Sequence, residues 1–202
     1  MKLRIALVRH GLTDGNFNHR MSGHTDHQLI PEGIDQLYKV KQNYEFPKYD
    51  RLYSSDLSRT YETAKILFDE EVRPENRRYG LREIFFGDIE NVDYRELRQP
   101  FHREFFTDSP LKIRAENAEI FQKRVFDELH NICQEMVEDD LKTVMIVAHA
   151  GTIRMIHFTL LNLKKENYRD LSIDNGTGFL FEIDYHPETR EMKLLDYHSI
   201  GG

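Results

Sequence analysis

The stretch that predicts the fold is LRIALVRHG, residues 3–11. Its apolar side chains follow one another almost without interruption, which is typical of a strand buried on both faces of a sheet. The strand then stops at an arginine, a histidine and a glycine, residues 9–11. In α/β proteins ligands bind beyond the carboxyl ends of the strands, so this end is the first candidate for a functional site.

The same arrangement returns twice along the chain. The apolar run VMIVA, residues 144–148, ends at HAG, and the shorter RLY, residues 51–53, ends at two serines. Amphipathic helical periods separate these runs. They fall at residues 34–44, 57–68, 121–136 and 153–163. This alternation predicts an α/β fold, a three-layer sandwich whose mainly parallel central sheet has helices on both faces.

Two further segments complete the expected architecture. Residues 179–185 and 193–197 read as strands that a turn joins into a hairpin at one sheet edge. Residues 87–115 have no clean period, and we expect a small lid-like insertion there. Its prolines and phenylalanines, which line an apolar mouth or simply pack, are Pro100, Pro110, Phe101, Phe105 and Phe106. With no repeat or linker, we expect one domain over residues 1–202.

The charge and the hydrophobic pattern of the chain limit the classes of partner that it can bind. The formal net charge is −7 with 35 acidic residues, which argues against a nucleic-acid partner and requires any anion site to be local. Neither a signal-peptide core nor an apolar run of about 20 residues is visible, so we expect no membrane partner. The single cysteine, Cys133, lies in an apolar period and is expected to be buried. A cytoplasmic location fits these features.

Residue types suited to anion binding gather after two strands. RHGLTDGN, residues 9–16, combines a guanidinium, an imidazole, a glycine and an amide donor. SSDLSRT, residues 54–60, opens a helix that a serine or aspartate can cap, and it places Arg59 in the positive first turn. An anion there would offset the repulsion. The alternative is a strand-end histidine with a routine hydrogen bond and an arginine in solvent.

Four segments together resemble the signatures of the histidine phosphatase, or phosphoglycerate-mutase-like, superfamily. They are RHGLT with Asn16, SSDLSR at residues 54–59, LRE at 81–83 and HAG at 149–151, in the family's order. The resemblance implies a metal-independent phosphomonoester hydrolase that carries the phosphoryl group on His10, with Glu83 as proton donor. It also implies which groups hold the phosphoryl oxygens: Arg9, Asn16, Arg59 and His149.

The chain departs from the family pattern around the expected pocket. Ser22 and Gly23 stand in a substrate loop where the family commonly has a glutamine and a glycine. The family's usual Leu-Thr before the next helix reads Leu29-Ile30-Pro31 here, so a capping hydroxyl is absent, while Pro31 takes a favourable position at the helix start. Ala150 and Ile89 differ from the family's common residues as well. These departures leave the small-molecule phosphomonoester substrate unidentified.

Ten histidines raise the question of a metal site. His19, His24 and His27 lie close in sequence, but their spacing matches none of the common zinc patterns. We therefore expect no metal and no cofactor, and we expect these histidines to face solvent or to contact the substrate.

Two rival functions use the same pocket. A phosphoglycerate-type mutase would return the phosphoryl group to a second substrate hydroxyl instead of water, and the length of this chain argues against it. A non-catalytic phosphate-recognition module would need neither His10 nor Glu83. The sequence leaves both a monomer and a homodimer open.

Overall fold

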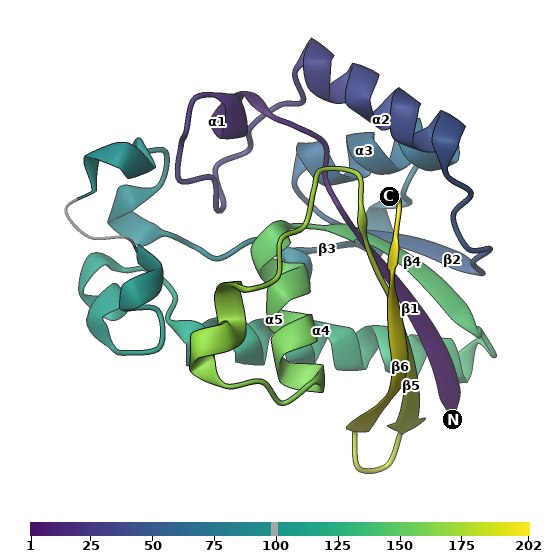
Figure 1. Cartoon of the computed structure of the whole chain (residues 1–202). Helices are drawn as coiled ribbons and strands as arrows, with labels where there is room; N and C mark the ends of the chain where they lie inside the picture. Colours follow the sequence, from purple (N-terminus) through teal and green to yellow (C-terminus); the bar gives the residue numbers. More distant parts are fainter. Residues whose placement is uncertain (98–100) are drawn as a thin grey trace.

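The strand predicted from residues 3–11 is β1, Lys2–Arg9, which lies inside a six-stranded sheet (Figure 1). The computed structural model describes residues 1–97 and 101–202, so Pro100 lies outside the described residues. The strand order is β3-β2-β4-β1-β5-β6. β4, Thr143–Ala148, pairs in parallel with β1 and with β2, Arg51–Ser55. The prediction of a mainly parallel centre is confirmed.

The remaining strands lie at the two sides of this centre. β5, Gly178–His186, pairs antiparallel with β1 and forms a hairpin with the edge strand β6, Glu191–Ile200. The predicted hairpin is confirmed. At the other edge, β3, Arg77–Arg78, pairs in parallel with β2. Sequence patterns missed this strand because two residues carry no period.

Helices cover both faces of the sheet, as predicted (Figure 1). α2, Pro31–Asn43, and α3, Ser58–Phe68, pack on one face, while α4, Ala118–Glu138, and α5, Ala150–Leu160, pack on the other. Because side chains alternate along a strand, Leu7 of β1 joins the core under α4 and α5, and the next residue, Val8, joins the core under α2 and α3.

The starts of α2 and α3 test two predictions about helix caps. α2 begins at Pro31 without a side-chain cap, as expected. The prediction that a local serine or aspartate caps α3 is wrong, because its N-cap position is held by Leu57, which has no acceptor. Asp26 caps the helix from a distant loop instead. Its Oδ1 accepts from the Ser58 backbone N–H at 2.9 Å and the Ser58 hydroxyl at 2.8 Å.

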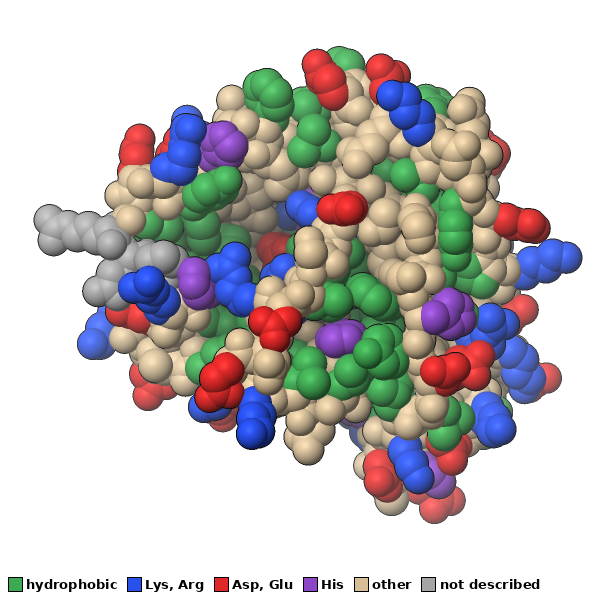
Figure 2. Space-filling model, viewed as in Figure 1, with side chains coloured by type: hydrophobic (Ala, Val, Ile, Leu, Met, Phe, Trp, Pro, Cys, Tyr) green, Lys and Arg blue, Asp and Glu red, His purple; other side chains and the backbone are tan. Residues whose placement is uncertain are grey.

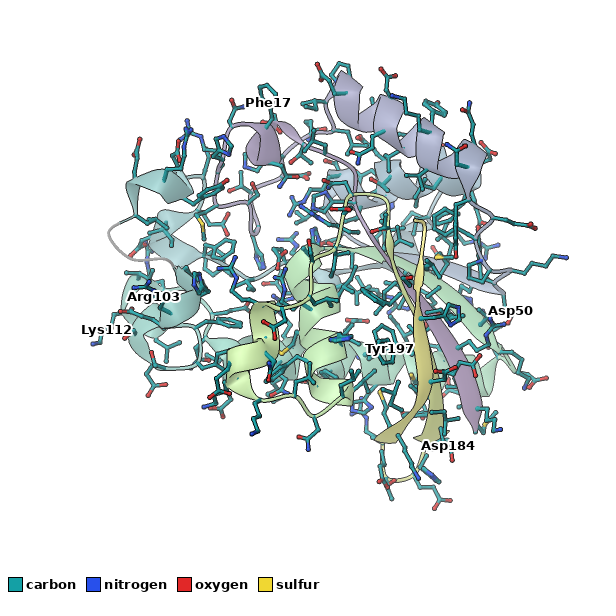
Figure 3. All side chains as sticks on the ribbon, viewed as in Figure 1. Phe17, Asp50, Arg103, Lys112, Asp184 and Tyr197 are labelled. Atoms are coloured by element: carbon teal, nitrogen blue, oxygen red, sulfur yellow. The ribbon has the colours of Figure 1, made fainter. Side chains whose placement is uncertain are left out.

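Short 3₁₀ turns build the segments between the regular elements. They are η1 Pro74–Asn76, η2 Tyr79–Leu81, η3 Gly87–Ile89, η4 Tyr94–Glu96, η5 Phe101–Arg103, η6 Ser109–Ile113 and η7 Lys165–Arg169, and the single-turn helix α1 is Asp14–Phe17. The aperiodic segment predicted at 87–115 is anchored by Phe105, which is 1% exposed and belongs to the main core. Arg103 and Lys112 lie on the outer side of this segment (Figure 3).

Two further predictions concern single features. Cys133 is buried within α4, as expected, and burial raises the pKa of its thiol to about 12. Within the described parts of the chain, no helix has the length and apolarity required to cross a membrane.

Candidate active site

The carboxyl ends of β1 and β4 bring two predicted residues together. In the parallel register Arg9 pairs with Ala148, so His10 and His149 follow neighbouring strands at the same level. Their ring centroids lie 5.2 Å apart. Side chains from β1, α3, the segment after η2 and the start of α5 gather here. We call this group the strand-end cluster, and it consists of Arg9, His10, Arg59, Glu83 and His149.

His10 has a defined tautomer. Its ring is 5% exposed, and Nδ1 lies 2.7 Å from the carbonyl oxygen of Gly11. A carbonyl oxygen only accepts hydrogen bonds, so Nδ1 carries the hydrogen and Nε2 keeps its lone pair. Burial, together with the charges of Arg59 and Arg9, holds the pKa of His10 well below its usual value. The ring is therefore a neutral imidazole with a free nitrogen at ordinary pH.

Arg59 is fully buried beside this ring. Its Nη1 donates to the carbonyl oxygen of Thr25 at 2.9 Å, and its Nη2 donates to that of Gly23 at 2.8 Å. Burial lowers the pKa of Arg59 to about 10, so the guanidinium stays charged near neutral pH. The buried cation therefore both holds the predicted substrate loop and supplies positive charge to the cluster.

Glu83 is held by two backbone donors. Oε2 accepts from the N–H of Gly151 at 2.9 Å, and Oε1 accepts from the N–H of Ile84 at 2.9 Å. Gly151 lies in the first turn of α5, where the helix dipole favours a carboxylate. A Cβ atom at position 151 would collide with the Glu83 carboxylate, which explains the glycine there.

Arg124 of α4 positions the segment that carries Glu83. Its guanidinium donates to the carbonyl oxygens of Gly80, Arg82 and Glu83, each at 3.0 Å, and it forms an ion pair with Glu116 at 2.7 Å. Sequence reasoning missed this residue. Arg124 lies 41 positions from Glu83, and nothing in the local pattern of α4 indicates such a contact.

Several buried nitrogens around the cluster have no hydrogen-bond partner within the described structure. Both ring nitrogens of His149 are of this kind, as are Nε of Arg9, Nε of Arg59 and Nε2 of His27. Burial, and then the charge of Arg59, hold the pKa of His149 well below its usual value. Because buried polar groups are almost always bonded, this concentration of unpaired nitrogens indicates the place of a polar ligand.

The three histidines considered for a metal have separate contacts. His27 is 7% exposed and its Nδ1 lies 3.1 Å from Oδ2 of Asp14. Of the two expectations for this residue, exposure to solvent is therefore wrong, and contact with the substrate stays a prediction. The Nε2 atom of His24 donates to the carbonyl oxygen of Glu83 at 3.1 Å, while His19 bonds to the Tyr94 hydroxyl. In residues 1–97 and 101–202, no group of three or more His, Cys, Asp or Glu side chains could hold a metal.

The other predicted residues, Asn16, Ser22 and Gly23, have the following contacts. Asn16 is half-buried, and its Oδ1 accepts from the backbone N–H of Thr13 at 3.3 Å and its hydroxyl at 3.0 Å in a capping box. The Ser22 hydroxyl donates to the carbonyl oxygen of Arg20 at 3.1 Å. Gly23 is buried and reaches the strand-end cluster through its bond to Arg59.

Glu90 is a second positioning residue that sequence patterns did not indicate. Its carboxylate accepts from the backbone N–H groups of His24, Thr25 and Phe86 at 2.9–3.0 Å. It also accepts from the Thr25 hydroxyl at 2.8 Å. Glu90 and Arg59 therefore hold the same loop from two different parts of the chain.

A cavity of about 470 Å³ adjoins the segment that follows Glu83. We call it the outer cavity. Ile84, Phe86 and Phe105 form part of its wall, and Arg154 and Tyr168 line it as well. Figure 2 shows this face of the molecule hollowed left of centre, with basic side chains gathered around the hollow.

Comparison with known proteins gives a family match over most of the chain. The matching family is described as the histidine phosphatase superfamily (branch 1), and the match covers residues 5–197. The adenosylcobalamin/alpha-ribazole phosphatase of Escherichia coli (strain K12) is 23% identical over 98% of this chain and 98% of its own length. The 2,3-bisphosphoglycerate-dependent phosphoglycerate mutase of Beijerinckia indica is 23% identical over 95% of this chain and 97% of its own length.

The solved structures agree with the observed architecture. The crystal structure of phosphoglycerate mutase from Bacillus anthracis str. Sterne matches with a TM-score of 0.75 and 22% identity, over 99% of this chain and 93% of that chain. At this identity the likeness shows the fold. The match to the Beijerinckia indica mutase over 97% of its length also corrects one argument from sequence, because chain length does not separate phosphatases from mutases here.

Proposed function

Because the chain belongs to the histidine phosphatase superfamily, we propose that it hydrolyses phosphomonoesters through a phosphohistidine intermediate on His10. One observation supports this above the others: a buried, neutral His10 with a free Nε2 stands among cationic and unpaired nitrogens. A neutral imidazole nitrogen is a nucleophile, whereas a protonated one is not. A pocket that only recognises phosphate has no use for a free lone pair.

The first step transfers the phosphoryl group to the protein. The Nε2 lone pair of His10 attacks phosphorus while the bond from phosphorus to the leaving oxygen breaks, and Glu83 gives a proton to that oxygen. This step requires Glu83 to carry a proton when the ester is bound. Arg9, Arg59 and His149, together with Asn16, stabilise the equatorial oxygens.

The second step returns the protein to its starting state. Glu83, now a carboxylate, takes a proton from a water molecule whose oxygen attacks phosphorus, and the bond between phosphorus and Nε2 breaks. Inorganic phosphate leaves, and His10 is again neutral. The arginines supply the charge that a metal ion supplies in other phosphatases, so we propose that no metal or cofactor takes part.

A mutase is the second candidate, since a relative with that name matches along almost its whole length. The two functions share the phosphoenzyme and differ in the acceptor. Incubation with 3-phosphoglycerate and a catalytic amount of 2,3-bisphosphoglycerate separates them: a phosphatase releases inorganic phosphate, whereas a mutase forms 2-phosphoglycerate without net release.

The direct test is capture of the phosphoenzyme. The protein is mixed with phenyl phosphate for milliseconds, quenched in alkali to preserve phosphohistidine, and mapped by mass spectrometry. We expect phosphate on His10 and a loss of turnover of at least about 10⁴-fold in His10→Ala, with normal behaviour in His186→Ala, an exposed histidine. Substantial turnover in His10→Ala would contradict the mechanism, and so would loss of activity on chelation that one added metal restores.

A further inference from the structure

The outer cavity is larger than a minimal leaving group requires. Its volume is about 470 Å³, whereas a cavity of about 150 Å³ accommodates a benzene ring. It adjoins the strand-end cluster, because Ile84 in its wall directly follows Glu83 and donates its N–H to the Glu83 carboxylate. The leaving group of an ester whose phosphorus faces Nε2 of His10 would therefore extend toward this cavity.

One part of the wall is apolar and aromatic. Ile84, Phe86, Phe101 and Phe105 belong to it, and the rings of Phe86 and Phe101 meet edge to face with centroids 5.0 Å apart. Phe105 is fixed in the main core. Such a wall favours a flat or apolar body over a strongly hydrated sugar.

The opposite part of the wall is cationic. Arg154 and Arg169 line the cavity together with His102, and no lining residue that the structure describes is acidic. Arg154 donates Nε and Nη2 to the carbonyl oxygen of Leu171 at 3.3 and 3.2 Å, and Arg169 contacts His102. Neither arginine has a carboxylate within ion-pair distance among the described residues.

These arginines continue the positive charge of the strand-end cluster outward. Burial lowers the pKa of Arg9, the Glu83 carboxylate acts against this change, and the charge of Arg154 acts in the same direction as burial. Burial and then Arg154 likewise lower the pKa of Arg169. Arg154 and Arg169 repel each other, and no described residue that lines the cavity is acidic, which favours an anion placed between these two arginines.

Tyr168 adds a hydrogen-bond donor that the fold leaves unused. Its side chain is 4% exposed and lines the cavity, and its hydroxyl has no partner in the described structure. Burial, and then the Glu83 carboxylate, raise the pKa of this hydroxyl above its usual value, so it stays protonated. A buried donor without a partner is costly unless a ligand supplies the acceptor.

We propose that the outer cavity binds the leaving alcohol of the substrate, and that this alcohol carries an anionic group on an aromatic or similarly sized apolar body. Arg154, Arg169 and the Tyr168 hydroxyl bind the anionic group, while the phenylalanines contact the body. The assignment rests on the proposed phosphatase function and names its substrate class. Carboxylates and phosphates share the required charge.

Matched aryl esters test this assignment. The substrates are 4-carboxyphenyl phosphate, its uncharged 4-carbamoyl analogue and phenyl phosphate, and the measured quantity is kcat/KM for each. We expect the acid to exceed the amide by about tenfold, mostly through KM, as one charge-assisted contact would give. The phenolate that leaves from the carbamoyl ester is a slightly better leaving group than the one that leaves from the carboxyl ester. Leaving-group chemistry therefore acts against the expected preference for the acid. The kcat/KM value for benzene-1,4-diyl bisphosphate, compared with that for 4-carboxyphenyl phosphate, then shows which of the two anionic groups the cavity prefers.

Substitutions of the two cavity arginines test whether the cavity causes the preference for the acid over the amide. In Arg169→Gln and Arg154→Gln we expect the ratio of acid to amide to fall below about threefold, and Arg169→Lys to retain part of it. Lys112→Gln removes an exposed charge on the outer side of the neighbouring segment and should keep the wild-type ratio (Figure 3).

The outcomes separate the cavity assignment from the proposed function. Hydrolysis of all three esters without preference for the acid, or a preference that survives both glutamine variants, would overturn the cavity assignment alone. No phosphoenzyme from any ester would overturn the proposed function, and the cavity assignment with it.

Discussion

The strand-end cluster and the outer cavity lie side by side but are held in different ways. In the cluster, His10, Arg59 and Glu83 each bond to backbone atoms of neighbouring strands, loops or helix ends. In the outer cavity, side chains of 3₁₀ turns pack near α5. Arg154 bonds to one backbone carbonyl, and neither Arg154 nor Arg169 has an acidic partner among the described residues. The cluster is therefore preorganised for one kind of group, whereas the arginines of the cavity depend on a bound ligand for their counter-charge.

This difference separates the two parts of the proposed reaction. Phosphoryl transfer requires fixed charges at fixed positions, which backbone hydrogen bonds provide. Recognition of the leaving alcohol needs shape and a few polar groups, which segments without regular structure can vary without disturbing the sheet. Substitutions in the cluster should therefore lower the rate for every substrate. Substitutions in the wall of the cavity should lower the rate only for particular substrates.

The largest effect we expect within this comparison comes from Glu83, which stands between the two regions. Glu83→Gln removes the proton that an alkyl ester needs for its basic alkoxide, while an activated aryl ester needs little help. We expect phosphorylation by an alkyl ester to slow by about 100-fold and phosphorylation by an activated aryl ester to slow much less. The measurement is the pre-steady-state rate of phosphoenzyme formation.

The matched variant for this experiment is Arg59→Lys, because Arg59 acts on the phosphoryl group that both esters share. It should slow both esters alike. Arg59→Ala is less informative, since it would leave a cavity and two buried carbonyl oxygens without donors. Equal slowing of both esters by Glu83→Gln would mean that Glu83 is not the leaving-group acid.

A smaller effect should follow from Glu90, whose carboxylate joins residues 84–90 to the loop at residues 23–25. In Glu90→Gln an amide group would face backbone N–H donors, so we expect the free energy of unfolding to fall by about 1–3 kcal/mol. We also expect kcat/KM to fall about tenfold for both ester types, because the Gly23 carbonyl that binds Arg59 would shift.

Urea denaturation and steady-state kinetics measure the two effects. Glu96→Gln, in the same segment but exposed, is the control and should change neither quantity. If Glu90→Gln has the same stability and kinetics as Glu96→Gln, the loop does not depend on this carboxylate.

The effect that we expect to be smallest near neutral pH is the pH dependence of stability, which grows as the pH falls. Burial holds the pKa of His10 and His149 below the ordinary value of about 6.5, so the unfolded chain binds protons that the folded chain does not as pH falls below that value. Stability is therefore full above about pH 6.5 and is lost below it, by about 1.4 kcal/mol per pH unit for each ring.

His149→Gln should reduce this slope by the contribution of one ring. The measurement is the free energy of unfolding at pH 7.5, 6.5 and 5.5, with His186→Gln as the exposed control. Identical slopes in wild type and His149→Gln would show that the folded protein protonates His149 as readily as the unfolded chain does.

Local patterns in the sequence were enough to predict the layers of the fold and the strand ends. The apolar run of β1 and the periods of α2 to α5 are properties of neighbouring residues, and they predicted the α/β sandwich that the structure has. The family resemblance identified six residues, and the structure places Arg9, His10, Arg59, Glu83 and His149 together, while the Asn16 side chain takes part in the capping box of α1. Their roles remain a prediction until the kinetics are measured.

Only the tertiary structure decided how those side chains are held and what lies beside them. Gly151 binds Glu83 across 68 positions, Asp26 caps α3 across 32, and Arg124 reaches Glu83 across 41. No local period encodes such contacts, because they depend on the strand order and on the packing of loops from different parts of the chain. The outer cavity is hidden from sequence for the same reason: its two arginines and its phenylalanines meet only once α5 and the 3₁₀ turns have packed against the sheet.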